Sequence, residues 1–143
     1  MHIVRLPNGE AIKLCHRPEW VDVFISPSIL YTFGEIIYVS KHKKLREIHL
    51  LDLLHEQVHM EQQRKYNKYW WSFRYIFTKS FRLDQEAEAF AAEIKHTVTL
   101  EARRKLLNQA AQWLSGKEYN HCAKSFEHAK EIVFNKCSYK DFI

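Results

Sequence analysis

The sequence has little glycine, proline or cysteine, with 3 of each in 143 residues. So few turn-forming residues favour long helices over a fold of many short strands. The cysteines are odd in number and far apart, so reduced thiols in a cytoplasmic protein are expected rather than a disulfide framework. The sequence also lacks an apolar run of membrane-spanning length and a signal-peptide core near its start, so no membrane partner is expected.

The charge balance is moderately basic, with a formal net charge of +5 and an isoelectric point near 9.1. This allows weak attraction to nucleic acid. The basic clusters at residues 41–44 and 102–105 are more simply interpreted as solvated faces, and no nucleic-acid-binding motif is present. A chain of this length suits a single domain, residues 1–143, with a β-rich portion over 1–44 and a helical portion over 45–143.

Local patterns predict an α+β fold, with a small N-terminal sheet followed by about four helices. Strands are expected at 2–6, 11–14 and 35–40, the first two joined by an Asn-Gly turn, and the segment 18–34 is ambiguous. Helices are expected over 45–66, from near Leu83, and over 101–114, with Ser40 as one cap for the first. A fourth helix carries Cys122, Phe126, Ala129 and Val133, and the aromatic segment 67–77 is expected to be a buried connector or a short helix.

The stretch LLHEQVHMEQQ, residues 53–63, contains the pattern H-E-x-x-H. Residues four apart on a helix lie one turn above each other, so His55 and His59 can reach the same metal ion. Glu56 lies beside this pair and can take a proton from a metal-bound water. Zinc suits neutral imidazole and brings the pKa of its bound water to about 7. The alternative is a helix whose histidines pack or face solvent.

A catalytic zinc usually needs a third protein ligand, and the next acidic cluster is RLDQEAEAFAAE, residues 82–93. At about 100° per residue, Glu86 and Glu93 fall about 40° and 60° from Phe90, at the edge of an apolar stripe. Asp84 and Glu88 point away from that stripe. A carboxylate at a buried edge must be paired or bound to metal. Glu86 is therefore the first candidate for the third ligand and Glu93 the second. The alternative for Glu86 is a surface ion pair with Arg82, four positions earlier. The stripe itself comprises Leu83, Ala87, Phe90, Ala91, Ile94 and Val98.

These segments resemble the gluzincin-type zinc metallopeptidases, most closely the small zincin-like proteins of bacteria and their phages. The resemblance rests on GEIIYVS, LLHEQVHMEQQ and FRLDQEAEAFAAE, spans about residues 33–93, and extends more weakly to WLSGKEYNH. It implies a zincin-like fold with His55, His59 and Glu86 as zinc ligands, Glu56 as general base, and a cytoplasmic location, which for a phage protein is the host cytoplasm. Larger gluzincins commonly have an aspartate where this chain has Phe90, so support for a ligand histidine must come from elsewhere.

Peptide hydrolysis also needs a group that stabilises the developing oxyanion. The candidates are Tyr119, His121, His96 and Arg82, and the sequence does not choose among them. Tyr119 and His121 are slightly preferred as catalytic residues because they follow a helix stop at Ser115-Gly116.

The leading hypothesis is a zinc metallopeptidase that hydrolyses a peptide or protein substrate with a zinc-bound water activated by Glu56. The first alternative is a zincin-fold binding module, weak or inactive in catalysis, that engages a protein or nucleic-acid partner. The second is a metal-free helical nucleic-acid-binding protein, based on the basic clusters and the aromatic segment. Substrate and oligomeric state do not follow from the sequence.

Overall fold

The computed structural model describes residues 1–26 and 28–143. Within those residues a four-stranded sheet is followed by five α-helices, which confirms the α+β class and adds one helix to the expected number. The chain divides into two compact units, Met1–Lys68 and Tyr69–Ile143. Each unit contains a hydrophobic core of its own. The expectation of a single domain over residues 1–143 stays a prediction.

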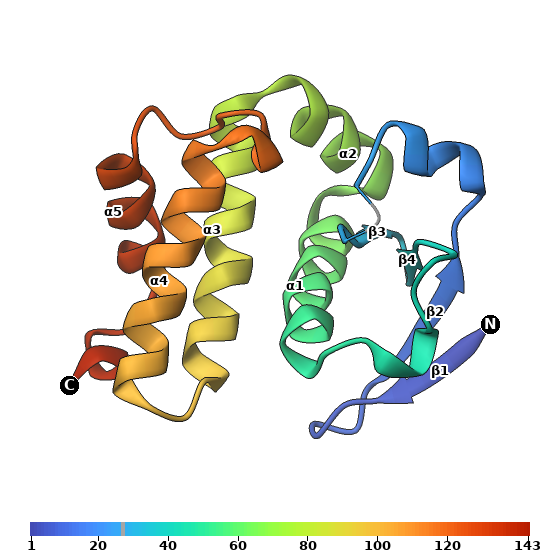
Figure 1. Cartoon of the computed structure of the whole chain (residues 1–143), viewed down its shortest axis with the longest axis horizontal. Helices are drawn as coiled ribbons and strands as arrows, with labels where there is room; N and C mark the ends of the chain where they lie inside the picture. Colours follow the sequence, from blue (N-terminus) through green and yellow to red (C-terminus); the bar gives the residue numbers. More distant parts are fainter. Residues whose placement is uncertain (27) are drawn as a thin grey trace. The chain divides into compact units, whose positions relative to one another are not determined.

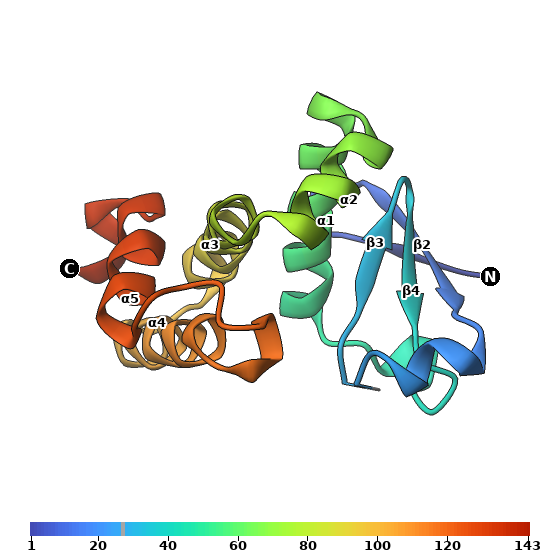
Figure 2. The ribbon, with the colours of Figure 1, turned by 90° about the horizontal axis from the view of Figure 1, so that it is seen from above.

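The sheet of the first unit has the strand order β1-β2-β4-β3 (Figures 1 and 2). β1 (His2–Arg5) and β2 (Ala11–His16) form the expected antiparallel hairpin, and Gly9 in its turn takes a φ of +87°. β4 (Ile36–Val39) runs parallel to β2, and β3 (Tyr31–Phe33) pairs antiparallel with β4 at the sheet edge. β3 therefore lies in the segment that the sequence left ambiguous.

Helix α1 (Leu50–Tyr66) packs on this sheet and carries the H-E-x-x-H pattern. Alternate residues of β2 and β4 point to one face of the sheet, where they meet apolar side chains of the helix. This burial is the main source of stability for a helix that also contains many polar residues. The core comprises Leu6, Ile12, Leu14, Ile37, Val39, Leu53, Leu54 and Met60.

The start of α1 differs from the expectation, whereas its end agrees. Residues 45–47 form a separate short 3-10 helix, and α1 begins at Leu50 after His49, whose side chain accepts from the Leu51 amide at 3.2 Å. The proposal of Ser40 as a helix cap is wrong. Its hydroxyl instead donates to the Asp22 carboxylate at 2.8 Å, and Asp22 also accepts from Arg17.

These hydrogen bonds belong to an ionic network that centres on Arg17, which is fully buried and organises the connection between β2 and β3. Its guanidinium donates to Asp22 Oδ1 at 2.8 Å and to the carbonyls of Ser26 and Ile29 at 3.0 and 2.6 Å. A buried cation is tolerable only when paired and hydrogen-bonded in this way. The hydrogen bond from Ser40, and after it the one from Arg17, lowers the pKa of Asp22 below its usual range despite its partial desolvation.

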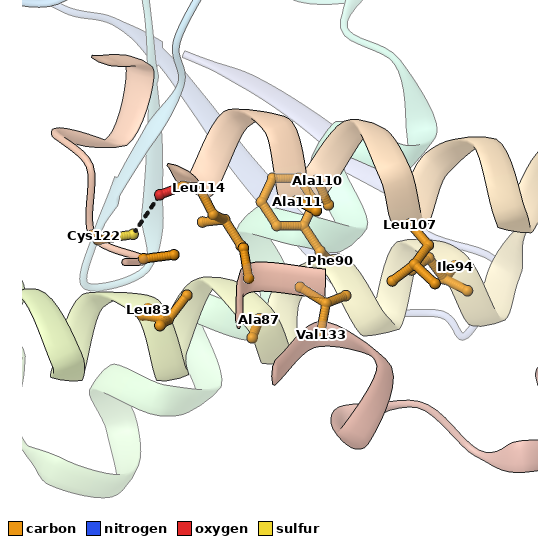
Figure 3. Close-up of a cluster of buried hydrophobic side chains, with 12 residues drawn as sticks. Leu83, Ala87, Phe90, Ile94, Leu107, Ala110, Ala111, Leu114, Cys122 and Val133 are labelled. Atoms are coloured by element: carbon orange, nitrogen blue, oxygen red, sulfur yellow. Dashed lines mark hydrogen bonds between the residues drawn. The ribbon is translucent and has the colours of Figure 1, made fainter. Parts of the chain in front are cut away.

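The second unit contains α3 (Lys79–His96), α4 (Leu100–Ser115) and α5 (Phe126–Lys136), packed around one core (Figure 3). Alanines at its centre allow the helices to approach closely. The helix that was expected from near Leu83 begins four residues earlier, and α4 ends at the expected Ser115-Gly116 stop. The core comprises Leu83, Ala87, Phe90, Ile94, Leu107, Ala110, Ala111, Leu114, Cys122, Ala123, Ala129 and Val133.

Two expectations for this unit are wrong. Cys122 does not lie on the expected fourth helix, because α5 begins at Phe126. Val98 does not join the apolar stripe, because α3 ends at His96 and leaves Val98 92% exposed. The aromatic segment forms a short helix, α2 (Lys68–Phe77), which was one of its two expected forms, and is not a buried connector. Within α2, Trp71 is the buried residue, donating from its indole to Gln85 of α3 at 2.9 Å.

All three cysteines are free thiols, as expected. Cys122 donates to the Leu114 carbonyl at 3.4 Å (Figure 3), and burial raises its pKa to about 11. Among the described residues, no helix is both long and apolar enough to cross a membrane.

Candidate metal centre

Three buried side chains of α1 lie together in the first unit. His55, Glu56 and His59 are 6%, 6% and 4% exposed, and their potential ligand atoms all lie within 4.8 Å of one another. The two imidazole rings meet edge to face with their centroids 4.9 Å apart. One helical turn separates the histidines, which explains why both reach the same place. The structure thus brings together the three residues of the H-E-x-x-H pattern.

A glutamine orients one of the two imidazoles. Gln62 Oε1 lies 2.9 Å from Nδ1 of His59, and both side chains are buried. Because an amide oxygen can only accept, this contact favours the tautomer with the proton on Nδ1, in which Nε2 is the nitrogen that could bind a metal. Metal-binding histidines almost always have such a partner on the second ring nitrogen. Gln62, three positions after His59 on α1, therefore occupies the supporting role for which Phe90 has no suitable group.

A threonine on the edge strand holds the glutamate of the pattern. Thr32 Oγ1 donates to Glu56 Oε2 at 2.6 Å, and the next contact of this hydroxyl, to the Glu56 carbonyl, is longer at 3.4 Å. Short O–H to carboxylate bonds are among the strong ones in proteins. Thr32 lies on β3, so a residue outside the helix restrains one carboxylate oxygen of Glu56.

Gln63 fastens the edge strand to α1, and this fixes the position of Thr32. Its side-chain amide donates to the Thr32 carbonyl at 2.8 Å, and its side-chain oxygen accepts from the Gly34 amide, also at 2.8 Å. Both ends of this buried amide are therefore used. Gly34 has a φ of +64°, which allows the tight turn between β3 and β4. The strand, its turn and the helix thus form one connected polar unit around Glu56.

The donors in this group fit a zinc ion. Neutral imidazole nitrogen and carboxylate oxygen are both zinc ligands, and a catalytic zinc is typically held by three protein groups with one position left for water. His55 and His59 supply two such donors. If Glu56 binds the metal, its carboxylate oxygen is the third donor. If Glu56 acts as a base instead, a carboxylate from another residue is expected as the third ligand.

Glu86, the predicted third ligand, lies on α3 in the second unit and is 2% exposed. Tyr75 donates to its Oε1 at 2.5 Å. The burial expected from the helical angles is therefore confirmed, and a surface location is excluded. Arg82, four residues earlier, donates to the backbone carbonyls of Tyr75, Ile76 and Tyr119. The ligand role of Glu86 stays a prediction.

The other carboxylates of α3 also follow the angular sorting. Glu93 is buried, whereas Asp84 and Glu88 are exposed. Asp84 forms an ion pair with Lys136 of α5 at 2.6 Å. Glu93 therefore remains the second candidate ligand.

The four candidates for oxyanion stabilisation all lie in the second unit. Tyr119 ends a short 3-10 helix, Lys117–Tyr119, that follows α4, and its half-buried ring packs edge to face on Phe90 with the ring centroids 6.0 Å apart. His121 is exposed, and its Nδ1 lies 2.8 Å from the Ser115 carbonyl. His96 is exposed at the end of α3, and Arg82 is buried among carbonyls. Their catalytic roles stay predictions.

Sequence reasoning missed Thr32, Gln62 and Gln63. Gln62 could have been found, because i and i+3 residues are neighbours on a helix and a glutamine there reaches the second histidine. Thr32 carries no local indication of its role, since it is 24 residues from Glu56 in the sequence.

A comparison with models of protein families finds no match to this chain, and comparisons with curated proteins and with solved structures find none either.

Proposed function

We propose that the chain is a zinc-dependent metallopeptidase in which His55 and His59 hold the metal and Glu56 is the general base. The observation that carries the proposal is the buried group of these three side chains, together with a hydrogen-bond partner that orients His59 and another that restrains Glu56. A helix with two chance histidines has no need of these supports. Glu86 remains the predicted third ligand on the sequence argument.

When bound, the metal would polarise a peptide carbonyl and lower the pKa of a water molecule. Glu56 would remove a proton from that water and deliver it to the amine nitrogen as the peptide C–N bond breaks. Oε2 of Glu56 already accepts from Thr32, which favours Oε1 as the oxygen that would take the proton. One water is consumed, and one carboxylic acid and one amine are formed.

The first experiment measures zinc and peptide cleavage in the same preparations. Wild type should contain close to one zinc per chain, His59→Ala should lose it, and Glu56→Gln should keep zinc but lose turnover. His42→Ala serves as the matched control, because His42 is exposed on the loop after β4. Wild-type protein without stoichiometric zinc, or Glu56→Gln with unchanged hydrolysis, would contradict the proposal.

One observation favours a second candidate, a zinc-bound binding module without peptidase activity. All three side chains of the group are buried, and structural zinc sites are closed to solvent whereas catalytic ones keep an open position. A module of this kind would show stoichiometric zinc and no cleavage across a library of peptides. It would also unfold when a chelator removes the metal.

A further inference from the structure

Helix α2 is apolar on two opposite sides. One side is internal to the second unit: Trp71 is buried, stacks on Tyr75 with centroids 4.9 Å apart, and donates to Gln85. At about 100° per residue, five other apolar side chains of α2 fall within an arc of about 120° on the outer side. We call this outer side the aromatic face. It comprises Tyr69, Trp70, Phe73, Ile76 and Phe77, which are between 44% and 70% exposed.

Exposed apolar side chains occur singly on most proteins, but a contiguous group on one helix indicates a binding surface. Phe73 and Phe77 contact each other with centroids 4.9 Å apart, and Ile76 lies beside them on the helix. These three side chains therefore form a continuous apolar strip that is exposed to solvent, on the side of α2 opposite the buried Trp71.

The stretch of sequence that contains this face carries charges of one sign. No aspartate or glutamate occurs between Glu61 and Asp84, whereas six lysines and arginines do. The Arg74 guanidinium stacks on the rings of Trp70 and Phe81, at 5.3 Å from each centroid, and so lies at the border of the aromatic face. Lys79, which is exposed at the start of α3, comes two residues after the end of α2. A complementary partner must therefore be both apolar and negatively charged.

We propose that the aromatic face of α2 binds the surface of an anionic lipid bilayer, with the helix lying in the plane of the headgroups. Tryptophan, tyrosine and phenylalanine are favoured at that depth, and lysine and arginine at its border pair with anionic headgroups. The expectation of no membrane partner rested on the lack of a spanning segment. A helix that lies on the surface does not need one.

Nucleic acid fits the face less well. Its affinity depends on the number of phosphates that lysines and arginines contact, and here the strip itself is uncharged and includes the aliphatic Ile76. Two cations, Arg74 and Lys79, border the strip, which is few for a surface whose affinity would depend on phosphate contacts. Stacking of bases on the aromatic rings is therefore kept as an outcome of the test.

The test is co-sedimentation of the full chain with vesicles of phosphatidylcholine, alone or mixed with phosphatidylserine. The test variant is Phe73→Ser, Ile76→Ser and Phe77→Ser combined. The matched control combines Trp20→Ser, Val23→Ser and Phe24→Ser, which removes a similar group of exposed apolar side chains from the first unit. Because both sets are exposed, circular dichroism should show intact folds.

Wild type and control should bind the mixed vesicles, with much weaker binding to phosphatidylcholine alone. The test variant should bind at least about tenfold more weakly, because three partly inserted side chains lose their apolar environment. Equal weakening in the test variant and the control, or no binding of wild type, would overturn the proposal. So would tight, salt-sensitive binding to single-stranded DNA or formation of a dimer, if the test variant abolished either and vesicle binding were absent.

A second measurement needs no loss of binding. Bromine on lipid acyl chains quenches tryptophan emission at short range, so vesicles with brominated lipid should quench wild type. Compared at the same bound fraction, Trp70→Phe should lose most of that quenching, whereas Trp113→Phe, which changes a ring packed against the core of the second unit, should retain it. Equal quenching in the two variants would show that another face meets the bilayer.

Discussion

Replacing Thr32 with valine tests the proposed centre at a residue that touches no metal. The hydroxyl of Thr32 is the donor to Glu56 Oε2 at 2.6 Å, and the side chain is buried on β3. Valine has nearly the same shape and suits a strand. The substitution therefore removes the hydrogen bond and preserves the packing.

The size of the effect follows from the kind of hydrogen bond that is lost. A hydrogen bond to a charged group contributes about 1.5–3 kcal/mol. If that free energy serves to hold the base in its reactive position, kcat falls by about 10- to 150-fold. The loss should stay below that of Glu56→Gln, because general-base catalysis itself contributes about 10²- to 10⁴-fold. Some loss of folding stability, about 1 kcal/mol, is also expected.

The assay is steady-state cleavage of a peptide identified with wild type, alongside zinc content and thermal unfolding. Thr32→Val should lower kcat with little change in KM or in zinc. Thr32→Ser keeps the donor and should recover most of the activity, which a purely structural role would not predict. A Thr32→Val variant with wild-type kcat would show that the hydrogen bond to Glu56 has no part in catalysis.

Three further predictions concern the proposed metal ligands and the buried ionic network. Gln62→Leu should weaken zinc binding by roughly 10- to 100-fold in a chelator competition assay, and unchanged affinity would remove its orienting role. Glu86→Gln should weaken zinc binding in the same assay while the exposed Glu88→Gln should not; identical behaviour would exclude Glu86 as a ligand. The pKa of Asp22 is lowered chiefly by the Ser40 hydrogen bond, so its contribution to stability is complete above its ordinary value of 3.8 and is lost as pH falls through the lower folded-state value. Denaturant unfolding should therefore show a stability advantage of wild type over Asp22→Asn near neutral pH that shrinks in acid, and a pH-independent difference would contradict this.

Local patterns were sufficient for features whose causes are local. The Asn-Gly turn and the i, i+4 histidines depend on residues a few positions apart, and the structure has both. The angular sorting of α3 also succeeded, because burial on a helix follows the position of a residue around its axis. Glu86 and Glu93 are buried, and Glu88 is exposed.

Features that depend on distant residues were missed. Ser40 reads locally as a helix cap, yet it donates to Asp22, 18 residues away. The pattern around residue 32 gave no indication that its hydroxyl reaches Glu56, because that contact exists only after β3 pairs with β4 and Gln63 fastens it to α1. The aromatic segment was expected to be a buried connector or a short helix, and its composition alone did not show that one side of that helix is exposed.

The place of Phe90 is explained by the core of the second unit. Its ring lies 5.9 Å from that of Trp113 and 6.0 Å from that of Tyr119, and the residue is buried. A carboxylate there would lose these contacts and be buried in apolar surroundings, which is costly. Because Gln62 orients His59 from within α1, the imidazole needs no carboxylate from α3 to fix its tautomer. The packing of the helical core and the orientation of the proposed metal ligand, His59, are thus separate requirements in this chain, and a phenylalanine at position 90 is compatible with both.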